Sequence, residues 1–249
     1  MSEKVDILCI AAHPDDAELH CGGTLLATAA QGGTFAICDL TAGERGSRGS
    51  AETRRMETEE ACRRLGLQSS RRVNLGMPDG AIRITEENIT RLVTTIRHYS
   101  PSILLIPSAD DRHPDHGNAH RLAREAWFNA GLPVVRTTRE GTEQEPHRPQ
   151  ALLYYDHAWE SEPDVIVDIS GQIDRKLDAL AAYGTQFQVP GREQDNQEGP
   201  ATFISGPEFM TYMIARMRRY GFMIGAEYGE AFHHPASPIP LKDIRTLIP

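Results

Sequence analysis

The chain has 249 residues, of which 39% are hydrophobic, and this is enough to build a full core as a single α/β domain. Its 26 Lys and Arg residues are outnumbered by 35 Asp and Glu residues, and the formal net charge of -9 argues against a nucleic-acid partner. No apolar stretch approaches the roughly 18 residues that a membrane helix needs. The four cysteines lack CxxC spacing, which indicates reduced thiols. We therefore expect a cytoplasmic protein with one domain, residues 1–249, and no membrane partner.

Short apolar runs alternate with helical patterns along most of the chain. The runs predict strands at 5–12, 34–40, 72–75, 102–106, 152–155 and 165–169, and the periodic segments predict helices at 17–30, 53–65, 89–96, 117–129, 173–183 and 207–220. This order is typical of the α/β class with a doubly wound, mostly parallel sheet. The polar, Gly- and Pro-rich segment 187–202 suggests a mobile flap, and 206–249 holds a C-terminal helix followed by a Pro-rich coil.

Two polar loops follow buried strands and share the order His-Pro-Asp. The first is AHPDD at 12–16, and the second is DRHPDH at 111–116. Ligands of such sheets bind beyond the carboxyl ends of the strands, where we expect these loops to meet. A hydrolytic zinc site needs three imidazole or carboxylate ligands and one open position for water. We assign the ligands to His13, Asp16 and His116.

Three residues of these loops remain for catalysis. Asp15, a carboxylate beside a metal-bound water, is the predicted general base. His113 is placed to stabilise an oxyanion or to protonate a leaving amine. Asp115 is expected to hydrogen-bond one nitrogen of His113 and to fix its tautomer.

Simpler interpretations exist for several of these features. An isolated HPDD sequence is compatible with a proline turn followed by an N-cap Asp. His20 lies about one helical turn beyond Asp16, but a further ligand would close the water position, so we do not assign it. His120 is expected to be exposed. His157 follows a predicted strand, which is compatible with a place at the pocket rim.

The residues of both loops resemble a known family. The sequences AHPDDAELHCGG, DRHPDHGNAH and AEYGEAF are similar to those of the LmbE-like (PIG-L) zinc N-deacetylases, and most of all to the bacillithiol biosynthesis branch. The resemblance implies a Rossmann-like fold and one zinc per chain, with ferrous iron as the alternative metal. It also implies hydrolysis of the acetamide of an N-acetylglucosaminide, which in this branch is N-acetylglucosaminyl malate, and a homo-oligomer, a trimer or a hexamer.

The resemblance also assigns site residues. The family's zinc ligands, base and oxyanion histidine fall on the residues chosen above. Its substrate-contacting acid falls on Glu44 and its substrate arginine on Arg54, for which a surface helix charge is the simpler interpretation. Arg112 is a further candidate for substrate binding, and the two arginines suit a dicarboxylate aglycone.

The chain departs from the family pattern at two places. His20 stands where relatives have a small residue. A tyrosine that some relatives send into the site from the last long helix aligns with Phe209, and Tyr212 is its alternative.

Three other activities stay open. The chain could deacetylate other small N-acetylated sugars, such as chitobiose-like compounds, or act as a thiol-conjugate amidase. It could also be a non-catalytic, metal-dependent sugar-binding module. Asp15 and His113 argue against the last, because binding alone requires neither.

Overall fold

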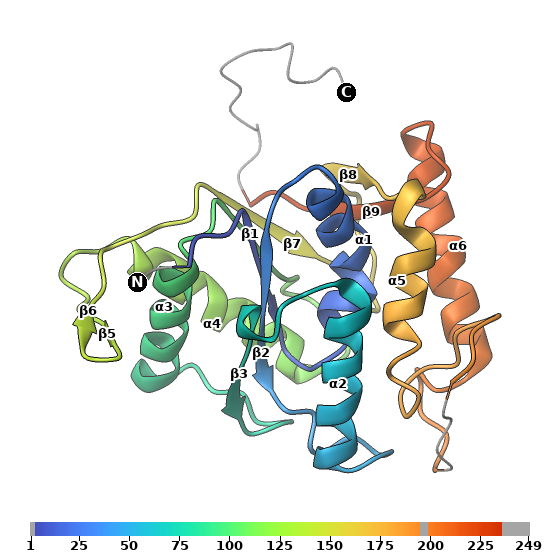
Figure 1. The fold of residues 1–249 in the computed structure, drawn as a ribbon, viewed down its shortest axis with the longest axis horizontal. Coiled ribbons are helices and arrows are strands. Elements are labelled where there is room, and N and C mark those ends of the chain that lie inside the picture. The colour runs from blue at the N-terminus through green and yellow to red at the C-terminus, as the bar shows by residue number, and fades with distance from the viewer. Residues whose placement is uncertain (1–2, 195–198, 236–249) are drawn as a thin grey trace.

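The centre of the molecule is a parallel sheet of five strands (Figure 1). The computed structural model describes residues 3–194 and 199–235. The strands lie in the order β3 (Arg72–Met77), β2 (Phe35–Thr41), β1 (Ile7–Ala11), β4 (Ile103–Pro107) and β7 (Ala151–Tyr155). Strand β1 pairs with β2 on one side and with β4 on the other. The strand order therefore reverses between β1 and β4, which is where ligands bind in sheets of this kind.

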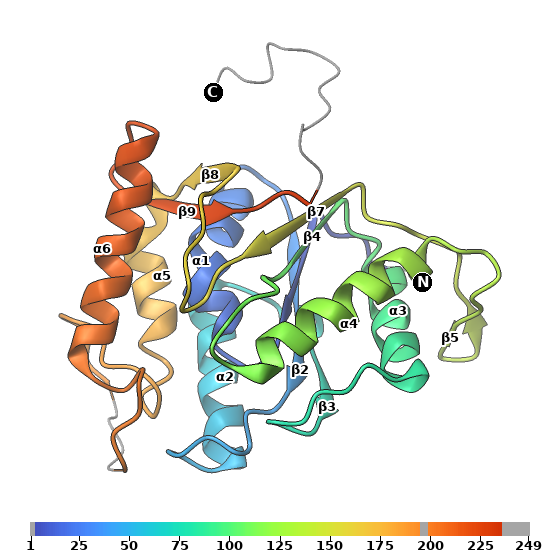
Figure 2. The same cartoon turned by 180° about the vertical axis from the view of Figure 1, so that it is seen from behind.

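Helices cover both faces of the sheet, which confirms the doubly wound, mostly parallel architecture. On one face lie α1 (Asp16–Ala30) and α2 (Ala51–Leu65), with α5 (Ile173–Leu180) and α6 (Pro207–Met223) beyond them. On the other face lie α3 (Glu86–Tyr99) and α4 (Pro114–Ala130), which Figure 2 shows in front of the sheet.

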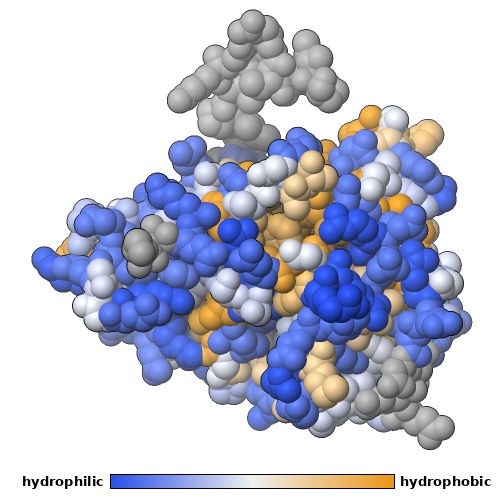
Figure 3. All heavy atoms as spheres, in the orientation of Figure 1, coloured by the Kyte–Doolittle hydropathy of each residue, from blue (hydrophilic) through white to orange (hydrophobic). Residues whose placement is uncertain are grey.

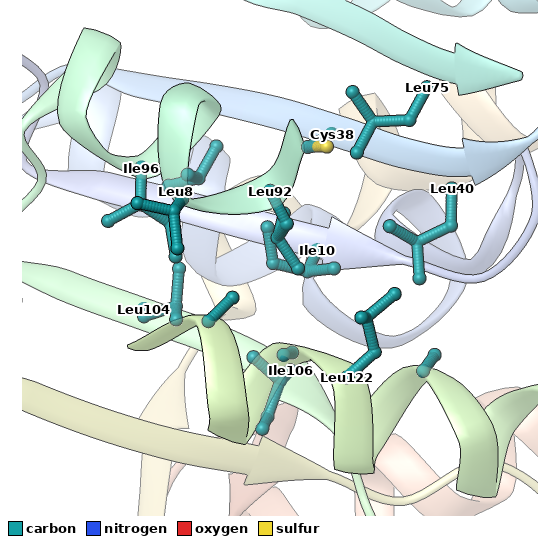
Figure 4. Packing of buried hydrophobic residues seen from close by; sticks show 14 of the residues in the cluster. Leu8, Ile10, Cys38, Leu40, Leu75, Leu92, Ile96, Leu104, Ile106 and Leu122 are labelled. Atoms are coloured by element: carbon teal, nitrogen blue, oxygen red, sulfur yellow. The ribbon is translucent and has the colours of Figure 1, made fainter. Parts of the chain in front are cut away.

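The apolar runs form strands because both sides of the sheet are buried. Along β1, Leu8 and Ile10 face the cluster under α3 and α4 (Figure 4), whereas Ile7 and Cys9 face the cluster under α1. A strand buried on both faces has no position for a polar side chain, and this explains its continuous apolarity. All four cysteines are free and buried, as expected of reduced thiols.

One predicted strand does not join the main sheet. Strand β8 (Val165–Asp168) pairs antiparallel with β9 (Gly229–Phe232). The sequence does not predict β9, which lies in the C-terminal segment after the last long helix. Only residues 156–164 separate β7 from β8, and a parallel pairing needs a crossover of a dozen residues or more. A short hairpin, β5 (Thr138–Arg139) and β6 (Thr142–Glu143), was also not predicted.

The predicted flap is partly incorporated in the core. Phe187 and Val189 are buried in the cluster with Leu180 and Met210, so the start of this segment is packed. Residues 195–198 and the Pro-rich coil at 236–249 lie outside the described residues. Over the described ranges, no helix is both long enough and apolar enough to cross a membrane. Hydrophilic residues dominate the face that Figure 3 shows, with apolar residues between them.

Candidate metal centre

The loops after β1 and β4 bring three candidate ligands together. Asp16 Oδ2 lies 3.5 Å from His13 Nδ1, and Asp16 Oδ1 lies 3.6 Å from His116 Nε2. Ligand atoms of the three residues all lie within 4.8 Å of one another. Metal–ligand bonds of 2.0–2.2 Å at tetrahedral angles separate ligand atoms by about 3.4 Å. The donor set and its spacing therefore fit a zinc ion.

The first loop is closed by its own side chains. The His13 amide donates to Asp16 Oδ2 at 2.9 Å, and the Asp16 amide donates to the His13 carbonyl. Between them Asp15 adopts φ 116°, a conformation that L residues rarely take. Such strain costs on the order of 1–3 kcal/mol and concentrates at functional sites. This backbone conformation turns the two adjacent carboxylates in different directions, so that Asp16 faces the histidines while Asp15 faces α2.

Each candidate histidine ligand has a carboxylate on its far nitrogen. His116 Nδ1 lies 2.7 Å from Asp111 Oδ1, and His13 Nε2 lies 3.2 Å from Asp79 Oδ1 and 3.5 Å from Asp115 Oδ2. Carboxylates in this position orient a metal-binding imidazole and make it a better donor. Neither Asp79 nor Asp111 is among the site residues predicted from the sequence. The available signal was that both follow the carboxyl end of a strand.

These carboxylates also hold protons on the histidines when no metal is present. Burial opposes protonation of His116, but Asp16 and Asp111 outweigh it and raise its pKa to about 9. The pKa of His13 likewise rises well above its ordinary value despite burial, through Asp115, Asp16 and Asp79. A metal must therefore displace protons from this site.

Asp115 holds His113 through its backbone and not through its carboxylate. Helix α4 begins at Pro114, three residues before the predicted start, and His113 is its N-cap. The Asp115 amide donates to His113 Nδ1 at 3.2 Å, which places the proton of a neutral His113 on Nε2. The Asp115 carboxylate instead accepts from the amides of Gly80 and Ile82. The expected hydrogen bond from Asp115 to one nitrogen of His113 is present, but the backbone amide makes it, because residues 80–82 and His13 surround the carboxylate.

Arg54 is buried and pairs with Asp15. Its Nη2 donates to Asp15 Oδ2 at 3.0 Å and also to the Pro14 carbonyl, and only 3% of the residue is exposed. It is therefore not a surface charge of α2. Burial raises the pKa of Asp15 to about 7, while Arg54 opposes that rise. A carboxylate whose pKa lies near neutrality is well matched to general-base catalysis.

The other candidate substrate residues lie on exposed loops. Glu44 is exposed, and its Oε1 accepts from the Asp79 amide at 2.8 Å. Arg112 is exposed beside His113, with its guanidinium 4.1 Å from the centroid of the Phe203 ring.

Phe209 of α6, which aligns with the family's site tyrosine, packs between Phe187 and Phe203. The hydroxyl of Tyr212, the alternative to Phe209, donates to Glu160.

Two further histidines lie beside the candidate ligands. His157 is buried, stacks on His116 with ring centroids 3.6 Å apart, and places Nε2 3.4 Å from Asp16 Oδ1. His20 stacks on Tyr155 and contacts His157 edge to face. Burial lowers the pKa of His157 to about 4 and that of His20 well below its usual value, so both rings are neutral. His157 thus lies deeper than the rim position that the sequence suggested.

His120 was expected to be exposed, but it is buried, with Nδ1 2.8 Å from the Pro107 carbonyl.

Fold and site together define an α/β protein with a candidate hydrolytic metal centre at the point where its strand order reverses. The profile of the PIG-L family, described as GlcNAc-PI de-N-acetylase, matches residues 8–127. The diacetylchitobiose deacetylase of Thermococcus kodakarensis is 32% identical over 192 aligned positions, and the alignment covers 73% of this chain and 70% of the relative. The chain belongs to the PIG-L family and is an amide-hydrolysing deacetylase, as expected from the sequence.

Two other similarities bear on the fold and the substrate. A protein of Bacillus cereus, named a probable N-acetyl-alpha-D-glucosaminyl L-malate deacetylase 2, is 28% identical over 200 residues, covering 74% of this chain and 84% of its own length. The crystal structure of a conserved protein from Thermus thermophilus superposes with a TM-score of 0.80 and 37% identity, covering 96% of this chain and 98% of that chain.

Proposed function

We propose that this protein is a zinc-dependent deacetylase that hydrolyses the acetamide of an N-acetylglucosaminide. The observation that carries the proposal is the convergence of His13, Asp16 and His116, with the Asp15 carboxylate, which Arg54 holds, next to Asp16 on the first loop. The ligand residues differ from the base, as hydrolysis by a metal-bound water requires. A bound zinc would lower the pKa of its water and polarise the acetyl carbonyl.

The chain's own residues account for the proton transfers. Asp15, held by Arg54, accepts a proton from the attacking water. His113 is half-buried, and burial holds its pKa below the usual value, so its neutral ring presents Nε2–H as a donor. That donor can stabilise the developing oxyanion. The proton that Asp15 took from the water then passes to the leaving amine. The water oxygen first forms a C–O bond to the acetyl carbon, the C–N bond then breaks, and the products are acetate and the free amino sugar.

Within this class we favour N-acetylglucosaminyl malate as the substrate. The malate-deacetylase name of the Bacillus cereus relative supports it, and Arg112 supplies an exposed cation next to His113 for a carboxylate aglycone. The deacetylase of Thermococcus kodakarensis favours the second candidate, a chitobiose-like disaccharide. Arg54 contributes less to this choice than the sequence suggested, because its guanidinium is committed to Asp15.

A mass-spectrometric assay can test the proposal and the choice of substrate. Purified zinc-loaded protein is incubated with N-acetylglucosaminyl malate, N,N'-diacetylchitobiose and N-acetylglucosaminyl inositol, and Asp15→Asn protein serves as the inactive control. We expect the highest kcat/KM with the malate compound and a selective loss for it in Arg112→Gln protein. A preference for the disaccharide would select the second candidate, and no hydrolysis of any sugar would refute the proposed function.

A further inference from the structure

A second set of ligand-type side chains lies behind the candidate metal centre. Asp16, His20 and His157 place one ligand atom each within 4.8 Å of one another, and all three are buried. His20 comes from the second turn of α1, and His157 from the loop after β7. Neither histidine has a role in the mechanism above.

Backbone contacts hold His157 in place, and Nε2 of its ring approaches Asp16 Oδ1 at 3.4 Å. Only 5% of the residue is exposed, and neither Nδ1 nor Nε2 has a hydrogen-bond partner among the described residues. Arg216 donates to the carbonyls of Asp156 and His157 and so fixes the backbone of this loop. Leaving a buried polar group unpaired costs about 1–3 kcal/mol. The arrangement therefore indicates that a ligand engages the ring.

The ring of His157 is aligned with a ring that is itself a candidate ligand. His157 and His116 stack at 3.6 Å with an angle of 15° between their planes. Both direct Nε2 at the same oxygen, Asp16 Oδ1, from 3.4 Å and 3.6 Å. Two parallel imidazoles at this spacing would hold two ions about 3.5–4 Å apart, the separation found in two-metal sites.

We propose that Asp16, His20 and His157 form a second cation site, which takes a divalent transition-metal ion such as zinc. It shares Asp16 with the zinc ion of the proposed function and in that respect rests on it. Two imidazoles and a carboxylate favour zinc or iron over magnesium or calcium.

The charges around the second site make it the weaker one. Arg216 and Lys176 act on His20 with positive charge, and Asp111 and Asp16 act on His157 with negative charge. Asp16 would serve both ions, so the second ion gains only part of its charge. Because the positive charges of Arg216 and Lys176 oppose a cation at His20, we expect the second site to bind its ion more weakly than the first.

Metal titration tests this site directly. Metal-free, full-length protein is titrated with Zn²⁺ against a competing chelator, and bound zinc is measured by elemental analysis. We expect two ions per chain in the native protein. His20→Asn protein should bind one ion, with unchanged first-site affinity and deacetylase activity, and the control variant His98→Asn should bind two. A single ion in the native protein, or two in His20→Asn protein, would overturn the proposal.

A second measurement does not depend on a variant. Anomalous diffraction at the zinc edge from native crystals grown with excess zinc should show two peaks, one of them bonded to His20 and His157. A second peak at any other place, or one peak only, contradicts the proposal. Neither measurement uses a substrate, so two bound ions in a protein that hydrolyses no sugar would refute the proposed function alone.

Discussion

Replacing Arg54 by methionine should move the acid limb of the pH–rate profile to higher pH. Arg54 Nη2 lies 3.0 Å from Asp15 Oδ2, and both residues are buried. Two unit charges about 4 Å apart attract by about 4 kcal/mol at an effective dielectric constant of 20, which corresponds to a pKa change of about 3. Carboxylates beside an arginine commonly show decreases in pKa of about 1–3. Loss of Arg54 should therefore raise the pKa of Asp15 by about 1–3.

The sign of the effect follows from the role of Asp15 as a base. A base with a higher pKa stays protonated, and therefore inactive, up to a higher pH. A bound metal lowers the pKa of Asp15 in native and variant protein alike, so the difference between them is the quantity to measure. The acid limb of kcat/KM reports a base of the free enzyme. We expect a shift of about 1–3 pH units in Arg54→Met protein and a smaller shift in Arg54→Lys protein, which keeps the charge.

The assay is kcat/KM from pH 5 to pH 10 with one neutral and one acidic N-acetylglucosaminide. An upward shift of equal size on both substrates supports positioning of Asp15 by Arg54. An unshifted acid limb, combined with a loss confined to the acidic substrate, would refute this reasoning. It would instead place Arg54 in the aglycone site, as the family resemblance implied.

Further predictions concern the metal, the proton transfers and stability. Asp15→Asn protein should keep its zinc while kcat falls by roughly two to four powers of ten, whereas His116→Ala protein should lose both zinc and activity. If Asp15→Asn protein is purified without zinc, Asp15 is a ligand and not the base. His113→Ala should lower kcat with little change in zinc content or KM, because its contact forms with the developing oxyanion; a change in KM alone would contradict that role. Zinc binding should release protons below pH 9, since the pKa of His116 is about 9 without metal. The apparent affinity for zinc should therefore rise with pH, and the calorimetric heat of binding should vary with the ionisation heat of the buffer. Lys176→Met should cost about 3–5 kcal/mol in urea unfolding, because the buried Glu230 carboxylate loses its charge partner, and adding Glu230→Gln should restore part of that loss.

The position of Arg54 illustrates what a sequence cannot give. Thr53–Leu65 reads as a charged helix, and Arg54 and Arg55 are equivalent to any analysis of composition or periodicity. In the structure Arg55 is exposed and pairs with Glu52 and Glu59, whereas Arg54 is buried against Asp15. The difference arises from the rotation of α2 relative to the first loop, which long-range packing sets. Asp79 was missed for a related reason, because it meets His13 only across a contact between two loops, whereas Asp111 meets His116 within one loop.

The sequence by itself determined the parallel sheet and the candidate ligands. Both are encoded locally: apolar runs buried on both faces make the strands, and His-Pro-Asp loops directly follow two of them. Tertiary structure alone decided that β8 pairs with β9, that Asp115 faces Gly80, and that His157 lies beside Asp16. These contacts join residues that are dozens to more than a hundred positions apart. The packing of helices and loops on the sheet fixes them, and no short-range pattern in the chain records that packing.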